Sequence, residues 1–101
     1  MPSSPAIAPA PLGGVAALRE YLRREAVAFE PEASATRING TVRVRVLVGP
    51  DGQVQQVKVT RGMRADYDDE ALRIVCDGPA WVPGIAGGRR AAIPVEVAVP
   101  F

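Results

Sequence analysis

The clearest pattern in the chain is an alternation of apolar and charged residues over residues 41–48, TVRVRVLV. The valines share one parity and the arginines the other, which is typical of a strand with one buried and one exposed face. The turn sequence GPDGQ follows, with Gly52 able to adopt a positive φ, and a second valine-rich segment covers residues 54–61. Together they predict a β-hairpin. Val54 has the opposite parity to the later valines, which predicts a bulge near Gln55-Gln56.

A third alternating segment closes the chain, and it is predicted to form one long last strand over residues 89–101. Its inner face is predicted to consist of Ile93, Val95, Val97, Val99 and Phe101. Pro94 and Pro100 share the other parity, so the N–H groups that they lack would both point to one side. Only a sheet edge tolerates this, and between the prolines Glu96 and Ala98 would present unpaired backbone groups outward. The last strand is therefore predicted to be an edge strand that is open over a short stretch.

Two segments have helical periodicity instead, and the first is VAALREYLRREA, residues 15–26. Its apolar stripe is predicted to consist of Val15, Leu18, Tyr21 and Leu22. A basic amphipathic helix is also typical of membrane-surface binding, but this stripe is short, so packing against the core is favoured.

The second helix is predicted over residues 66–77, with Asp68 or Asp66 capping its N-terminus. Its buried stripe is predicted to consist of Ala71, Leu72, Val75 and Cys76. Gly78-Pro79 ends the helix. Trp81 is expected to fill the core where this helix meets the last strand, in preference to stacking on a ligand, and Pro83-Gly84 turns the chain into that strand.

The order helix, strand, strand, helix, strand predicts an α+β fold. We expect a two-layer sandwich, a three-stranded antiparallel sheet with two helices on one face. Residues 1–12 are rich in proline and alanine, which favours an extended segment that packs poorly. They are interpreted as the end of a linker, with a tail of no function as the alternative, and residues 13–101 as the domain.

Charge and composition exclude several classes of partner. The net charge is +1 and no basic cluster is longer than two residues, so nothing in the sequence favours nucleic-acid binding. No stretch approaches the roughly 18 consecutive apolar residues of a membrane span. The N-terminal residues lack the basic and apolar regions of a secretory signal.

Candidates for catalysis or metal binding are few. The chain has no histidine, and its one cysteine, Cys76, is expected on an apolar stripe near a helix C-terminus, where neither a cation nor a base would activate it. Four acids cluster at the start of the second helix: Asp66, Asp68, Asp69 and Glu70. They lack the spread of about twelve residues that a calcium loop needs, so helix capping and solvation are favoured. The sequence predicts no catalytic residue, metal site or cofactor.

Several short motifs follow one another along the chain: the opening GG with ALREYL, ING before the first strand, and V.V.VLV..DG.V..VKV across the hairpin. They continue with DDEALRIV in the second helix, P.W.PG at its exit and VPF at the end. In these motifs the chain resembles the C-terminal domain of TonB, the energy transducer of Gram-negative bacteria, especially the short Bacteroidetes-type form. In this frame Gly52, Asp68, Trp81, Pro83 and Gly84 are structural residues.

The resemblance implies a non-enzymatic periplasmic module. A proline-rich spacer would tether it to an inner-membrane helix, absent from this chain, that associates with ExbB and ExbD. The module would dock the TonB box of outer-membrane transporters by strand addition and so couple the proton-motive force to uptake. The docking edge would consist of Ala92, Pro94, Val95, Glu96, Val97, Ala98 and Val99, with Arg89 and Arg90 as charge contacts.

Several alternatives stay open. The same edge could pair with its own copy and give a homodimer through the last strand. The same fold could serve as the periplasmic domain of a regulatory or peptidase-type membrane protein, or of a TolA-like envelope protein. A small enzyme would require a cofactor or a partner chain to supply acid–base groups.

Overall fold

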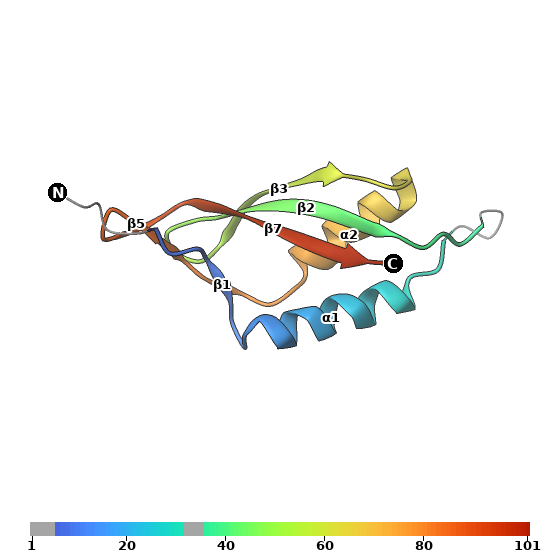
Figure 1. The fold of residues 1–101 in the computed structure, drawn as a ribbon, viewed down its shortest axis with the longest axis horizontal. Helices are drawn as coiled ribbons and strands as arrows, with labels where there is room; N and C mark the ends of the chain where they lie inside the picture. The colour runs from blue at the N-terminus through green and yellow to red at the C-terminus, as the bar shows by residue number, and fades with distance from the viewer. Residues whose placement is uncertain (1–5, 32–35) are drawn as a thin grey trace.

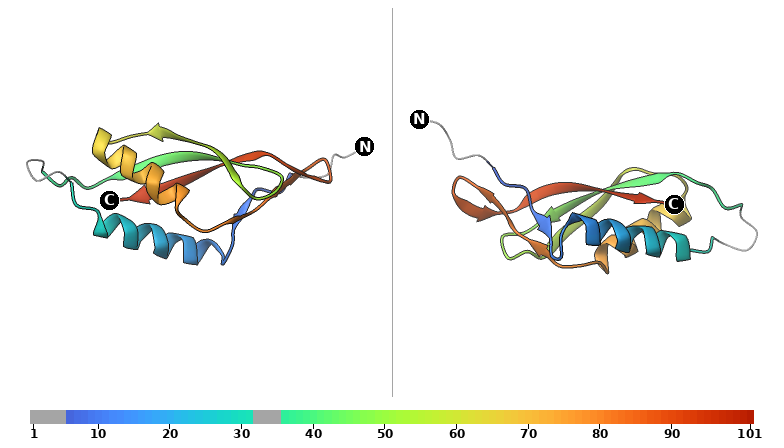
Figure 2. Two further views of the ribbon diagram at one scale, coloured as in Figure 1. Left: turned by 180° about the vertical axis from the view of Figure 1, so that it is seen from behind. Right: turned by 60° about the horizontal axis from the view of Figure 1, so that its bottom comes forward.

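The computed structural model of the chain describes residues 6–31 and 36–101 (Figure 1). The central sheet has the order β3-β2-β7, built from β2 (Thr41–Val48), β3 (Val54–Arg61) and β7 (Ile93–Pro100), and both pairings are antiparallel. Helices α1 (Val15–Ala28) and α2 (Ala65–Cys76) lie on the same side of the sheet (Figure 2). The predicted α+β sandwich, with two helices on one face of a three-stranded sheet, is confirmed.

Strand β2 forms the centre of the core. All four of its valines are fully buried, whereas its two arginines are exposed on the face away from the helices. Burying one valine side chain contributes roughly 1.5–3 kcal/mol, so this alternation strongly fixes the register of the sheet. The predicted bulge is also present, because Leu47 pairs with Gln56 and Val48 with Val54, which leaves Gln55 unpaired.

The buried face of α2 differs from the prediction. Its buried residues are Tyr67, Ala71, Ile74 and Val75, and Leu72 is only partly buried. Cys76 is exposed, so its predicted place in the core is wrong. Successive side chains of an α-helix are rotated by about 100° about the helix axis. Cys76 therefore lies beside the buried face that contains Ile74 and Val75.

Helix α1 packs against the core through the C-terminal half of the helix. Leu22 and Ala26 are buried, and the Tyr21 hydroxyl donates a hydrogen bond of 2.7 Å to the backbone oxygen of Ile74 in α2. Burial raises the pKa of Tyr21 above its ordinary value. Val15 is 53% exposed, so its predicted place on the buried stripe is wrong.

The predicted last strand is divided in two. Residues 89–91 form β6 (Arg89–Ala91), which pairs with β5 (Gly84–Ala86) in a separate hairpin, and Ala92 separates it from β7. Gly87 and Gly88 both have positive φ, at 61° and 74°. A two-residue turn with positive φ at both positions matches the twist of a hairpin, and this explains why residues 89–91 pair locally and not with β2.

The described part of the proline-rich segment is packed, contrary to the prediction; residues 1–5 of the predicted linker lie outside the described residues. Residues 7–12, which we call the N-terminal strap, run beside residues 80–85. Within the strap, β1 (Ala10–Pro11) pairs with β4 (Trp81–Val82), and Ile7 and Ile85 exchange two hydrogen bonds of 2.7 and 2.8 Å. Pro9 and Pro11, two residues apart, are buried.

The strap lies against Trp81 and Gly84, two of the residues that were predicted to be structural. Trp81 is 7% exposed and belongs to the core, and Pro83 is half-buried. A Cβ on Gly84 would approach the Ile7 oxygen and the Pro9 ring to 2.9 Å, so only glycine fits under the strap. Gly52, with φ 82°, lies in the hairpin turn, where a Cβ would collide with the Trp81 oxygen.

Candidate functional site

Strand β7 lies at one edge of the sheet, as the spacing of its prolines predicts. It pairs with β2 alone, in a register that runs from Thr41 opposite Pro100 to Val48 opposite Ile93. The register has no shift along this length, so the outer side of β7 is not interrupted by a bulge.

The hydrogen bonds at the end of the ladder show which residues of β7 face outward. Gly40 and Phe101 exchange both backbone hydrogen bonds, with N···O distances of 3.1 and 2.7 Å. Because such pairs alternate in an antiparallel ladder, Val95, Val97 and Val99 bond to β2. Glu96 and Ala98 therefore direct their N–H and C=O groups away from the sheet. Pro94 and Pro100 belong to the same outward set, where the N–H that each lacks is not needed.

The predicted edge residues separate into three groups in the structure. Glu96 and Ala98 are exposed, with their backbone open to a partner, whereas Val97 and Val99 face the core and Val95 is half-buried. Ala92 lies before β7 begins. Arg89 and Arg90 are exposed in the β5–β6 hairpin and do not belong to this edge strand.

Glu96 also has partners on the uncovered face of the sheet. Its carboxylate lies 3.7 Å from the Arg43 guanidinium and accepts a 3.3 Å hydrogen bond from the Thr60 hydroxyl. Both side chains of the ion pair are about half exposed, so the pair adds little to stability. It does keep the Glu96 side chain over the neighbouring strands and away from the open edge.

A groove of about 370 Å³ lies beside the open part of β7. We call it the edge groove. Its walls are residues 95–98 of β7, the first two turns of α1, and the strap with Trp81. Sequence reasoning missed the strap wall. Pro9 and Pro11, spaced so that they share one face of an extended chain, are the signal that could have revealed it.

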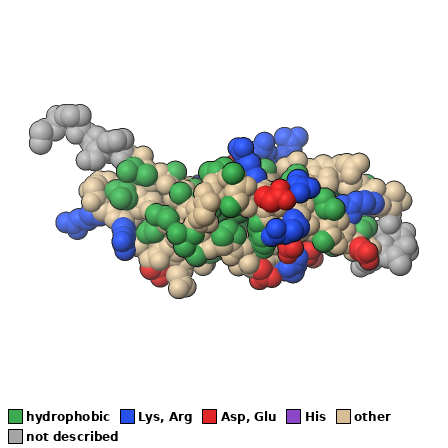
Figure 3. Space-filling view, turned by 90° about the horizontal axis from the view of Figure 1, so that it is seen from below, with side chains coloured by type: hydrophobic (Ala, Val, Ile, Leu, Met, Phe, Trp, Pro, Cys, Tyr) green, Lys and Arg blue, Asp and Glu red, His purple; other side chains and the backbone are tan. Residues whose placement is uncertain are grey.

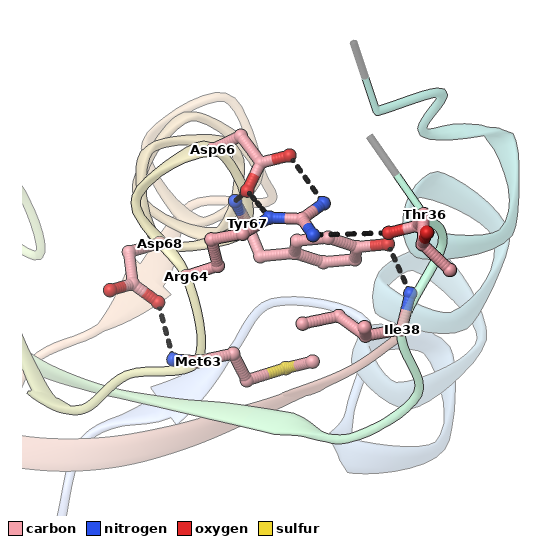
Figure 4. Close-up of polar contacts among 7 residues, drawn as sticks. All are labelled: Thr36, Ile38, Met63, Arg64, Asp66, Tyr67 and Asp68. Carbon is pink, nitrogen blue, oxygen red and sulfur yellow. Dashed lines mark hydrogen bonds and ion pairs between the residues drawn. The ribbon is translucent and has the colours of Figure 1, made fainter. Parts of the chain in front are cut away.

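The acid-rich start of α2 forms a different kind of structure (Figure 4). The Arg64 guanidinium bonds both oxygens of Asp66, at 2.7 and 2.9 Å, and the Thr36 backbone oxygen at 3.0 Å. Its hydrogen bond lowers the pKa of Asp66. The buried Tyr67 hydroxyl accepts a bond of 2.8 Å from the Ile38 N–H. We call these contacts the α2 clasp, because they tie the helix to residues 36–38.

Asp68 has a structural role, but not the predicted one. The N-cap of α2 is Arg64, which makes no side-chain cap hydrogen bond. Asp68 instead accepts a 2.8 Å bond from the N–H of Met63, just before the helix. Within residues 6–31 and 36–101, no three acidic or cysteine side chains come together as a metal site would require.

Comparison with known proteins identifies the family. A family model described as the C-terminal domain of Gram-negative bacterial TonB protein matches residues 25–101. Searches of curated proteins and of solved structures give no match. Neither helix in the described part of the chain is long and apolar enough to cross a membrane. The chain belongs to the TonB C-terminal family, whose members are non-enzymatic periplasmic domains that act through protein–protein interaction.

Proposed function

We propose that this domain binds an extended peptide segment of an outer-membrane transporter, the TonB box, by adding it as a further strand to the outer side of β7. The observation that carries the proposal is the open stretch of β7, in which Glu96 and Ala98 offer backbone groups outward on a strand of regular register. Family membership supports the choice of partner.

The geometry limits the ladder to a short one. Pro94 and Pro100 offer no N–H to a partner, so only the N–H groups of Glu96 and Ala98 can donate. Strand addition takes its affinity from main-chain hydrogen bonds and its specificity from alternate side chains. We therefore expect moderate affinity, with selectivity set by the side chains that flank the ladder.

The same arrangement suits the transmission of force. Strand β7 is paired along its whole length with β2, whose valines form the centre of the core. A load on a docked strand would pass through β7 and β2 to the rest of the domain. In the proposed assembly, a spacer and a membrane helix that associates with ExbB and ExbD connect the domain to the inner membrane. The proton-motive force would thereby drive uptake.

A peptide titration tests strand addition. Synthetic TonB-box peptides would be titrated into the isotopically labelled domain while amide shifts are recorded. The largest shifts are expected at Glu96, Ala98 and their neighbours in β7. Shifts confined to the helices would contradict the proposal.

A matched pair of modified peptides makes the test specific. Successive residues of an added strand direct their N–H groups alternately toward β7 and away from it. N-methylation of the residues that face β7 should abolish binding, whereas N-methylation of the others should leave it intact. Equal effects of both modifications would also contradict strand addition. Light scattering of the protein without peptide tests the alternative. A dimer fraction that increases with protein concentration would show that the β7 edge pairs with a second copy of the chain instead.

A further inference from the structure

We propose that the edge groove selects the sequence of the docked peptide. It binds apolar side chains from two alternate positions of the peptide and an acidic side chain beside Arg19. This inference rests on the proposed function, because the groove selects residues only of a strand that pairs with β7. It adds the chemistry of the partner: an extended segment whose apolar residues alternate with polar ones and whose acidic residue lies on the groove side.

Sheet geometry determines which peptide side chains reach the edge groove. Residues directly opposite each other in neighbouring strands have their side chains on the same face. Val95 and Val97 point toward the helices, so the peptide residues opposite them point to that side as well. That is the side on which α1 and the strap complete the groove.

The walls of the edge groove suit apolar side chains. Apart from Arg19 and Glu96, all of the groove's lining residues are apolar, and one of them, Val15, is 53% exposed. Three further exposed hydrophobic side chains, Ile7, Leu12 and Val82, belong to the strap and β4 but do not line the groove. Figure 3 shows hydrophobic side chains concentrated in one half of this face, whereas charged side chains are most frequent in the other half, with a few at the opposite tip. Such a concentration on one part of a surface marks an interaction site.

Charge adds a second condition. Arg19 lines the edge groove, is exposed and has no ion-pair partner among the described residues, whereas Arg23 on the same helix bonds Glu20 at 2.6 Å. A guanidinium at the rim favours an acidic residue on the peptide. The peptide residue opposite Glu96 points instead to the uncovered face, where Glu96 lies beside the exposed Arg43 and Arg45.

Amide exchange in the strap reports on whether a peptide side chain occupies the edge groove. Its Ile7 N–H bonds the Ile85 oxygen and its Leu12 N–H bonds the Ala80 oxygen, at 2.7 and 2.9 Å. A peptide side chain packed against the strap would hold it in place and slow the exchange of both amides. Docking on the β7 backbone alone would leave their exchange unchanged.

The test compares two peptides of equal length. One carries leucine at both positions that face the groove, threonine between them, and an aspartate two residues beyond one leucine, so that it also faces the groove; the other carries serine in place of both leucines. The leucine peptide is expected to bind about tenfold more tightly or better. It alone should slow exchange at Ile7 and Leu12.

Matched variants locate the effect. Val15→Asp should weaken the leucine peptide about tenfold and leave the serine peptide unchanged, whereas Val27→Asp, at the other end of α1, should affect neither. Arg19→Glu should weaken both peptides severalfold at low salt, and Arg24→Glu should not. All four positions are exposed, and thermal unfolding checks that the variants remain folded.

The two levels of the proposal can fail separately. Equal affinity of the two peptides, with binding still abolished by N-methylation on the β7 side, would overturn the role of the groove and leave strand addition standing. Binding that is insensitive to N-methylation would overturn both.

Discussion

The two edges of one sheet differ in this molecule. Strand β7 is paired regularly along its whole length, whereas the register of β3 shifts twice, leaving Gln55 and Thr60 without partners opposite them. Bulges of this kind twist an edge and interrupt the row of backbone groups that another strand could use. By topology both strands are edges, but only β7 offers an edge without a bulge.

The side chains strengthen the difference. Lys58 lies opposite Arg45 and Arg61 lies opposite Arg43, so β3 places cations beside cations on the uncovered face. Charged side chains, lysine above all, discourage the addition of another strand. Beside β7 lies an apolar groove instead. Bulges and like charges thus close one edge of the sheet, whereas two prolines limit the other edge without closing it.

The largest expected effect is on peptide binding through β7. Ala98→Pro removes one of the two outward donors without touching the bonds to β2, and should weaken a TonB-box peptide by about 2 kcal/mol or more. Calorimetric titration measures this. Ala98→Ser, which keeps the N–H, should bind normally, and so should Gln55→Pro at the bulge of β3. Equal losses of affinity at β7 and β3 would show that the two edges do not differ in peptide binding.

The second prediction is a change in the stability of the domain that leaves peptide affinity unchanged. Tyr67→Phe removes the hydroxyl that accepts the Ile38 N–H and leaves that half-buried donor unpaired. The free energy of unfolding should fall by about 1–2 kcal/mol, measured by urea denaturation. Peptide affinity should stay the same, because the α2 clasp belongs to neither edge. A parallel loss of affinity would show that the β7 edge depends on the clasp.

A smaller effect tests the charges of β3. Lys58→Glu replaces a like-charge pair with an opposite-charge pair across from Arg45 and should stabilise the domain by about 0.5 kcal/mol at low salt. The gain should shrink at high salt, and Lys58→Gln should give about half of it. Peptide binding should not change. If Lys58→Glu destabilised the domain, Lys58 and Arg45 would not repel each other as proposed.

The smallest effect is a pH dependence remote from both edges. The Arg64 hydrogen bond lowers the pKa of Asp66 in the folded state, so the pair stabilises the fold fully above the unfolded pKa of Asp66. This contribution is lost as the pH falls through the folded pKa. Asp66→Asn should therefore unfold more readily than the parent near neutral pH and equally readily in strong acid. A difference that persists in strong acid would assign the effect to another cause.

Much of the fold follows from short-range patterns. The parity of the valines in β2 predicts its register, and the parity of Pro94 and Pro100 predicts that β7 is an open edge. Each pattern depends on one periodicity of the backbone, so it can be recognised in the sequence alone.

The edge groove and the strap follow from no such pattern. A two-residue strand such as Ala10–Pro11 has no periodicity, and its partner lies about seventy residues away at Trp81–Val82. The misplacement of Cys76 has a related cause. The spacing of apolar residues in a sequence locates the buried stripe of a helix only to within one residue. The packing of α2 against the sheet decides that Ile74 is buried and Cys76 is not.

Amide hydrogen exchange can show which of the two sheet edges receives a peptide. By the alternation of the ladders, Glu96 and Ala98 in β7 and Val57 and Val59 in β3 all direct their N–H groups outward. The account predicts that a bound TonB-box peptide slows exchange at Glu96 and Ala98 and leaves Val57 and Val59 unchanged. Protection at β3, or no change at Glu96 and Ala98 under saturating peptide, would contradict it.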